Sequence, residues 1–428
     1  MSRDLAMAGG RPVWSKGWPP WPQADVGAVD GLIGIARGAR WAVSGSWTGR
    51  PPIELELSRR FAEFVGADWC IPVDHGSSGL LSCMTALGIG PGDEVIVPGL
   101  AWVACASAVV RAGAVPVLVD IDSRTLCMDP DAVAAAIGPS TAAVLVVHLY
   151  SAMADMTALS DLAARHGLAL IEDSAQAYGA TWRGAAAGSL GVAGSFSTQQ
   201  GKTLTSGEGG LVVTSDRELR NKIEMLRGDG RMYRTSELVI GRPDLEERAD
   251  VQGWNMHLSE FQAALLLDGL DRLNEQNNRR AAMAAALDKA LVSMDDLEPI
   301  EPYRDNDRRA YYHYAIRLKD SAFGGASARV VCEALSAELG YWIHEPYRPL
   351  NSHPLYDPRR LPLAAGLGNV SAWNPGQYDL PVAHRESVRT ILLHHPMLLG
   401  DDQHLNAIVE AFDKVREHAR ELPRCGQQ

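Results

Sequence analysis

Three short segments of the chain carry polar residues in an order that suggests a single reaction centre. The first, His75–Gly79 (HGSSG), precedes an apolar stretch predicted to be helical. Its glycines let the backbone approach a ligand closely, and its serines and the free N–H groups of a helix start can bind an anion such as phosphate. The same residues also suit a simple helix cap, so this segment alone does not identify a site.

The second and third segments contain an acid and an amine. Asp173 ends an apolar strand and must find a cationic partner or shift its pKa upward, unless it caps the next segment. Lys202 lies between two predicted strands; a buried lysine can lose its proton and form a Schiff base, although most loop lysines are solvated. The three segments together supply an anion-binding loop, an acid at a strand end and a lysine. This combination predicts a site for pyridoxal phosphate (PLP), whose ring withdraws electrons when its nitrogen is protonated.

The elements that must position these residues alternate along the chain. Strands are predicted at residues 94–98, 115–120, 142–148, 169–172, 192–197 and 210–214, with helices between several of them, as at 128–137 and 159–166. This alternation predicts a mostly parallel sheet covered on both faces, with ligands bound beyond the carboxyl ends of the strands. Further along, we expect a long helix, strand-like segments and two more helices at about 259–276, 311–318, 328–338 and 402–422.

The length of 428 residues favours a large domain and a smaller one. We expect an N-terminal arm over residues 1–50, a large PLP-binding α/β domain over 51–275 and a smaller α+β domain over 276–428. The arm contains Trp14, Trp18 and Trp21, with one short helix near 25–37. A segment so rich in tryptophan is expected to pack on its own domain or on a partner subunit.

Charge and cysteine content exclude several classes of protein. The formal net charge of -12 argues against nucleic acid or an anionic membrane as a partner. The six cysteines form no C-x-x-C pair, so we expect buried free thiols and neither a metal site nor a disulfide framework. With no apolar stretch near 18 residues and no leader pattern after Met1, we expect a cytoplasmic protein without signal peptide or membrane span.

Longer stretches resemble the DegT/DnrJ/EryC1/StrS family of PLP-dependent aminotransferases, which have fold type I (aspartate aminotransferase-like). The similarity runs from about Arg40 to the C-terminus. It is carried by Gly90–Pro98 (GPGDEVIVP), Glu172–Gly179 (EDSAQAYG), Gly194–Ser197 (GSFS), Gly207–Gly210 (GEGG) and Asn255–Ala264 (NMHLSEFQAA).

The resemblance implies a role for each matching residue. Lys202 matches the lysine that holds PLP as a Schiff base and moves the proton, and Asp173 matches the partner of the pyridine nitrogen. Gln176 is expected near the 3-hydroxyl of the ring, and Trp102 is expected to stack on it. Phosphate contacts are expected from Ser77, Ser78, Ser197 and, across a subunit boundary, Asn255. The family resemblance therefore implies an obligate homodimer with shared active sites.

The lysine loop, Gln199–Gly210 (QQGKTLTSGEGG), is similar to that of family members acting on scyllo-inosose or 2-deoxy-scyllo-inosose in aminoglycoside antibiotic biosynthesis, with L-glutamine as amino donor. The stretch His344–Leu355 (HEPYRPLNSHPL) and the pair His394-His395 also resemble that branch. Because a keto-cyclitol is uncharged and rich in hydroxyls, its pocket needs neutral hydrogen-bonding groups. We expect these from Gln200, His344 and Tyr347, with Gln199 and His394 as further sources.

Other substrates and classes stay open at this point. Ser151 stands where the family usually has glycine, and His257 stands where sugar-acting members often have arginine. A nucleotide-linked keto-sugar, or the acceptor of an aminohydroxybenzoate-synthase-like enzyme, is therefore the alternative. A related dehydratase group carries histidine in place of Lys202, and a non-catalytic PLP-binding regulator would need a DNA-binding domain; neither fits this chain.

Overall fold

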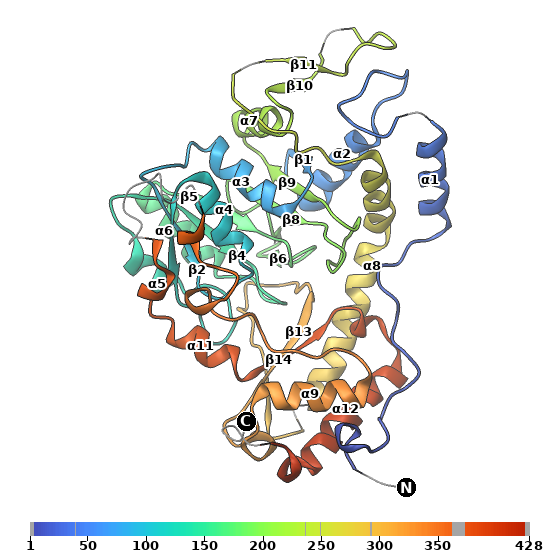
Figure 1. The fold of residues 1–428 in the computed structure, drawn as a ribbon, viewed down its shortest axis with the longest axis vertical. Helices are drawn as coiled ribbons and strands as arrows, with labels where there is room; N and C mark the ends of the chain where they lie inside the picture. The colour runs from blue at the N-terminus through green and yellow to red at the C-terminus, as the bar shows by residue number, and fades with distance from the viewer. Residues whose placement is uncertain are drawn as a thin grey trace.

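The computed structural model describes residues 4–38, 40–235, 237–248, 250–291, 293–361 and 373–423. Its larger part is a seven-stranded sheet with helices packed on it, and its smaller part surrounds a three-stranded sheet. Helix α8 (Glu260–Leu291) runs from the larger part into the smaller one (Figure 1).

The seven-stranded sheet has the strand order β1-β9-β8-β5-β4-β2-β3. Strand β9 pairs antiparallel with β1 and with β8, and the other pairings are parallel, as predicted. The bounds are Trp69–Val73 (β1), Glu94–Pro98 (β2), Val115–Val119 (β3), Thr141–Val147 (β4), Ala169–Asp173 (β5), Ala193–Ser197 (β8) and Gly210–Thr214 (β9). Strand β1 escaped the sequence analysis because Pro72 interrupts a short apolar run, and proline normally argues against a strand interior.

Helices cover this sheet on both faces, each through its own apolar core. Helices α3 and α4 pack with one face of the sheet, whereas α2 and the first half of α8 pack with the other. The sheet-covering and flanking helices are α2 (Ile53–Val65), α3 (Gly76–Ala86), α4 (Ala104–Ala112), α5 (Pro130–Ala136), α6 (Met156–His166) and α7 (Arg217–Arg227). Burial of apolar side chains on both faces is what a mostly parallel sheet requires.

The smaller part follows the predicted α+β pattern. Strands β12 (Leu297–Pro299), β13 (His313–Leu318) and β14 (Thr390–His394) form an antiparallel sheet. Helices α9 (Ala328–Leu339) and α12 (Asp402–Glu417) pack on it around a second apolar core, and α11 (Pro381–Ser387) leads into β14. The larger part also contains two short antiparallel strand pairs. These are β6–β7 (Thr181–Trp182, Ala185–Ala186) and β10–β11 (Arg231–Tyr233, Leu245–Glu247).

Helix α8 spans Glu260–Leu291 and is longer than the predicted 259–276. The polar run that starts at Asn277 suggested a helix end, but Asn277 and Arg280 are buried and the alanine-rich residues 281–287 continue the helix. The helix packs on α1 (Val26–Arg37) and α2 at one end and on α12 at the other. The domain boundary predicted after residue 275 falls inside this helix and stays a prediction.

The N-terminal arm packs on its own chain. Its backbone N–H groups at Ala6 and Val13 donate to Glu338 of α9, and Trp14 and Trp18 both contact the ring of His404. The arm then leads into α1 (Val26–Arg37), whose N-terminus is capped by the side chain of Asp25.

Five cysteines, Cys70, Cys83, Cys105, Cys127 and Cys332, are buried free thiols, as expected, and Cys425 lies outside the described residues. Within the described ranges, no helix is long and apolar enough to cross a bilayer.

Candidate active site

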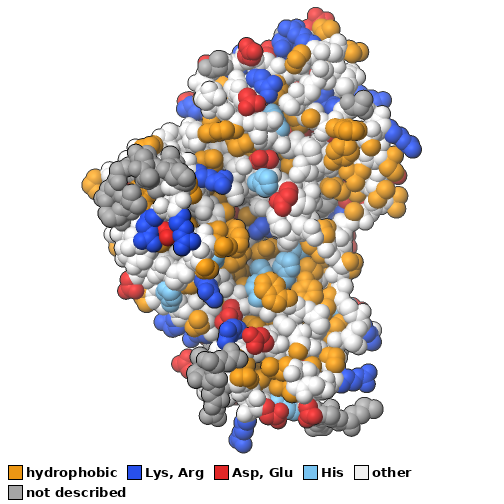
Figure 2. Space-filling model, viewed as in Figure 1, with side chains coloured by type: hydrophobic (Ala, Val, Ile, Leu, Met, Phe, Trp, Pro, Cys, Tyr) orange, Lys and Arg blue, Asp and Glu red, His pale blue; other side chains and the backbone are white. Residues whose placement is uncertain are grey.

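A cavity of about 410 Å³ lies at the carboxyl ends of β4, β5 and β8 and the N-terminus of α3. Figure 2 shows the molecule hollowed on this face, between the larger part above and the smaller part below. The lining residues are His75, Gly76, Ser77, Leu80, Trp102, Ala104, Val147, Asp173, Ala175, Gln176, Ser195, Ser197, Gln199, Lys202, Glu208, Tyr312 and Tyr347.

One end of the cavity is built to hold an anion. Helix α3 begins at Gly76, directs its first turn into the cavity and carries Ser77 there. A Cβ atom at Gly76 would lie 2.8 Å from the Cβ of Ser197, and one at Gly79 would lie 2.5 Å from the Oγ of Ser195. Glycine is therefore required for the helix to approach β8 this closely, and the approach brings free N–H groups beside two hydroxyls.

Asp173 ends β5 on the floor of the cavity. One carboxylate oxygen accepts the N–H of Ala175 at 3.1 Å. Burial raises the pKa of Asp173 from its usual value, against the opposing effects of that hydrogen bond and of the charges of Lys202 and His148. The neighbouring groups thus balance the negative charge of the carboxylate only in part, and a cationic group bound in the cavity would stabilise it.

Behind Asp173, a buried pair ties the end of β4 to β5. The Nε2 atom of His148 lies 3.0 Å from Glu172, whose carboxylate also accepts backbone N–H groups from Gly188, Leu190 and Gly191. The backbone N–H of His148 donates to the carbonyl of Asp173 at 3.2 Å. These hydrogen bonds hold in place the end of β5, which carries Asp173.

Lys202 enters the cavity from the loop between β8 and β9. Burial lowers the pKa of its amine to about 8, although the nearby carboxylate of Asp173 acts in the opposite direction. The Nζ atom lies over the ring of Tyr312, 4.4 Å from its centroid. Such contact stabilises the ammonium form, while burial makes the neutral, nucleophilic form accessible near neutral pH.

Another part of the cavity wall is formed by aromatic side chains and by the side-chain amide of Gln176. The side-chain oxygen of Gln176 accepts the N–H of Tyr150 at 2.8 Å, and its amide lies 3.4 Å from the hydroxyl of Tyr347. The hydroxyl of Tyr150 in turn accepts the N–H of Tyr347 at 3.1 Å. Trp102 packs against Tyr347 with ring centroids 5.6 Å apart, and 48% of its surface is exposed toward the opening.

Most predicted site residues meet in this one cavity. Those that line it are Ser77, Trp102, Asp173, Gln176, Ser197, Gln199, Lys202 and Tyr347. Ser78 lies one residue further along α3 and is not part of the lining. Asn255 is exposed at the surface and its backbone pairs with that of Gly228; its role toward a neighbouring subunit stays a prediction.

Three residues predicted for the substrate, Gln200, His344 and His394, lie outside the lining of the single chain, and the ring of His394 contacts the carbonyl of Gly201 instead. The ring of His344 stacks on Trp342, with centroids 4.1 Å apart, and contacts the carbonyl of Glu345. The backbone carbonyl of Gln200 accepts the indole N–H of Trp21. Their roles toward substrate stay predictions.

Sequence reasoning missed Tyr312, which supplies the aromatic face under the lysine amine. It precedes β13 and lies 110 positions from Lys202, so no local pattern connects the two. The run Tyr311–Tyr314 (YYHY) was a possible signal, because such aromatic density is unusual at a strand start. His75 and Glu208, 3.6 Å apart at the rim, were quoted only as parts of motifs.

Comparison with known proteins agrees with this arrangement. The model of the DegT/DnrJ/EryC1/StrS aminotransferase family matches residues 35–391. An L-glutamine:2-deoxy-scyllo-inosose aminotransferase from Streptomyces paromomycinus is 45% identical over 98% of this chain and 99% of its own. A protein of the same name from Streptoalloteichus tenebrarius is 46% identical over 99% of this chain and 100% of its own.

Among solved structures, 3-amino-5-hydroxybenzoic acid synthase superposes with a TM-score of 0.77 at 30% identity. The superposition covers 94% of this chain and 100% of that one.

Proposed function

The chain belongs to the DegT/DnrJ/EryC1/StrS aminotransferase family, and from that premise we propose that it uses PLP to transfer the amino group of L-glutamine to a keto-cyclitol. The acceptor is 2-deoxy-scyllo-inosose or a close relative, and the reaction is a step of aminoglycoside biosynthesis. The observation that carries the proposal is full-length identity of about 45% to enzymes named for that reaction.

The cavity fits the cofactor in size and in chemistry. The start of α3 with Ser77 and Ser197 suits its phosphate, and Trp102 offers a flat face for its ring. Asp173, under-compensated in the cavity, suits a protonated ring nitrogen. When bound, PLP supplies a carbonyl that condenses with amines and a ring that withdraws electrons from the bond being broken.

Lys202 has two tasks in this reaction. Because burial lowers the pKa of its amine to about 8, a usable fraction is uncharged near neutral pH and can attack a carbonyl. When it is not bound to a carbonyl carbon, the same amine can take a proton from one carbon and return it to another, since the pKa of the amine lies close to the working pH. Tyr312 keeps the amine over the cavity through the contact of Nζ with its ring.

The lining supports an uncharged acceptor. Among the described residues around the cavity, Lys202 is the one lysine or arginine, and the remaining polar groups are hydroxyls, amides, a histidine and two carboxylates. A nucleotide-linked sugar carries a diphosphate, which proteins usually bind with arginine or lysine. A polyhydroxylated ring instead needs neutral donors and acceptors such as Gln176, Gln199 and Tyr347.

A homodimer with shared sites is part of the proposal. Asn255 is exposed and lies beside Trp254, of which 47% is exposed. Helix α1 also presents Val26, Val29 and Ile33 on one exposed face, with exposed fractions of 76%, 51% and 43%. Exposed apolar surface of this kind is typical of subunit contacts, and a second chain would bring its own Asn255 to a neighbouring cavity.

The deciding experiment is a competition between 2-deoxy-scyllo-inosose and a nucleotide-linked keto-sugar, each with L-glutamine as donor and product identified by mass spectrometry. We expect kcat/KM to favour the cyclitol, with Lys202→Ala as the inactive control. A preference for the nucleotide sugar would refute the proposed acceptor but not the proposed aminotransferase activity. A third vessel containing the keto precursor of 3-amino-5-hydroxybenzoate tests the function named for the structural neighbour.

A further inference from the structure

The loop that carries Lys202 belongs to the larger part of the protein. It forms hydrogen bonds with the N-terminal arm and with the end of β14 in the smaller part. We propose that Trp21, with His394 and His395, forms a positioning device for the catalytic lysine, acting through the two peptide carbonyls that precede it. The inference rests on the proposed function, because it concerns how accurately Lys202 is placed for that chemistry.

Both carbonyls before Lys202 accept ring N–H groups. The indole Nε1 of Trp21 donates to the carbonyl of Gln200 at 3.1 Å. The Nε2 atoms of His394 and His395 each lie 3.1 Å from the carbonyl of Gly201. Three rings from two distant parts of the chain therefore converge on two consecutive peptide groups.

The histidines must act as neutral donors in these bonds. A carbonyl oxygen can only accept, so each Nε2 carries its proton toward Gly201. Burial lowers the pKa of His394 to about 4 and that of His395 well below its usual value, with the nearby charge of Arg280 acting in the same direction. At neutral pH both rings stay uncharged, and the donation does not depend on protonation.

Trp21 is itself fixed by its surroundings. Its ring meets that of His395 edge to face, with centroids 4.6 Å apart, and the guanidinium of Arg280 lies 5.3 Å from its ring centroid. Arg280 is fully buried in α8 and donates to Asn277, while its Nε and Nη2 atoms have no hydrogen-bond partner among the described residues. The face of the indole thus adds an electrostatic contact to that buried cation beside its hydrogen bond to Asn277.

Upstream, the arm is attached to the smaller part of the protein. The indole of Trp18 donates to the carbonyl of Leu339 at 2.8 Å, and Glu338 accepts two backbone N–H groups of the arm and the ammonium of Lys414. Trp21 therefore connects a segment anchored on α9 and α12 with the lysine loop of the larger part.

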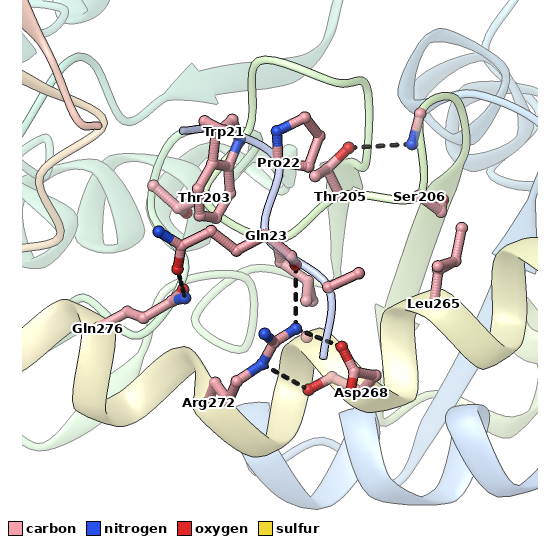
Figure 3. Close-up of a pocket in the computed structure, with 14 residues that line it drawn as sticks. Trp21, Pro22, Gln23, Thr203, Thr205, Ser206, Leu265, Asp268, Arg272 and Gln276 are labelled. Atoms are coloured by element: carbon pink, nitrogen blue, oxygen red, sulfur yellow. Dashed lines mark hydrogen bonds and ion pairs between the residues drawn. The ribbon is translucent and has the colours of Figure 1, made fainter. Parts of the chain in front are cut away.

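On the side that faces the arm and α8 the loop borders a cavity, although Leu204 itself is buried in the apolar core between α2, α8 and the sheet. Immediately after Lys202, residues Thr203–Gly207 border a second cavity of about 230 Å³, enclosed by arm residues Trp21–Ala24 and by α8. Figure 3 shows this cavity with the arm crossing above Asp268, Arg272 and Gln276 of the helix. The hydroxyl of Thr203 is buried there and has no hydrogen-bond partner among the residues that the structure describes. Packing on that side is therefore incomplete, and the ring N–H bonds to the carbonyls of Gln200 and Gly201 attach the loop to the arm and to the end of β14, in addition to its internal hydrogen bonds.

Two matched substitutions test the inference on the intact, cofactor-loaded enzyme. Trp21→Phe and Trp18→Phe each keep a ring and remove one indole N–H donor to a backbone carbonyl, but only Trp21 contacts the lysine loop. The measurements are amide hydrogen exchange of residues 198–207, kcat, KM for the acceptor, and Tm. We expect Trp21→Phe to accelerate exchange in the loop and to lower kcat roughly fivefold with little change in KM, as for one lost hydrogen bond.

Trp18→Phe should lower Tm by a similar amount and leave loop exchange and kcat unchanged. If Trp21→Phe changes only Tm, as Trp18→Phe does, the positioning role is wrong. At His395, glutamine can keep an N–H near the position of Nε2 and leucine cannot, so His395→Gln should retain more activity than His395→Leu; equal loss would also overturn the inference. An inactive wild-type enzyme would instead refute the proposed function.

Discussion

Replacing Asp173 by asparagine should weaken catalysis and leave the fold intact or more stable. In the wild-type protein the pKa of Asp173 is raised by burial, so its charged form costs stability at every pH above the unfolded pKa. Asparagine removes that cost and can still accept the N–H of Ala175. The Tm of the cofactor-free variant should therefore equal or exceed that of the wild type.

The expected loss in catalysis follows from the charge that asparagine cannot supply. Two opposite charges about 3 Å apart interact by roughly 5 kcal/mol at an effective dielectric constant of about 20. Part of this is offset by the desolvation of the carboxylate, so we expect a net loss of about 3 kcal/mol. That loss corresponds to a fall in kcat of roughly 100-fold.

The assay measures kcat for glutamine-dependent amination together with Tm in the absence of cofactor. Asp120→Asn is the matched control, because Asp120 also follows a strand end but accepts the backbone N–H groups of Val382 and Ala383 at the start of α11. It should lower Tm and leave kcat unchanged. An Asp173→Asn enzyme with kcat within threefold of the wild type, or with a Tm loss like that of the control, would refute the reasoning.

Three further predictions concern the amine, the ring face and the subunit boundary. In cofactor-free protein, amine labelling of Lys202 should rise with pH around a midpoint near 8, because burial disfavours its ammonium; a midpoint near the ~10.4 of an unperturbed lysine would contradict the site. Trp102→Ala should raise the Kd for cofactor by roughly tenfold through lost stacking, whereas Trp102→Phe should recover most of it; unchanged affinity in both would exclude stacking. Mixing inactive Lys202→Ala and Asn255→Ala subunits should restore activity through one intact site per heterodimer, and no recovery after verified exchange would exclude a shared site.

The sheet and the core of the site could be predicted from sequence because their signals are local. Strands β2 and β9 were predicted to the residue, and the strand-end rule placed Asp173 and the lysine loop at one edge of the sheet. The end of α8 was wrong because a polar run resembles a helix end unless its burial is known.

Contacts between distant segments could not be predicted in this way. Tyr312 reaches Lys202 from a different sheet, and Trp21 reaches Gln200 across 179 positions of sequence. Each contact depends on how the arm and the smaller part pack against the larger one, which no periodicity in the sequence records. The tryptophan-rich arm was expected to pack on its own domain or on a partner subunit; in the structure it packs on its own chain, and its contact with the lysine loop emerged only from the structure.

The central claim is that Lys202 holds the cofactor, and one measurement tests it most directly. The purified protein is reduced with borohydride, digested, and the peptides are identified by mass spectrometry. The chain has only six lysines, so the modified residue can be assigned without ambiguity. We predict a single phosphopyridoxyl adduct on Lys202, absent from Lys202→Ala. An adduct on any other lysine, or an active enzyme that carries none, would contradict the account.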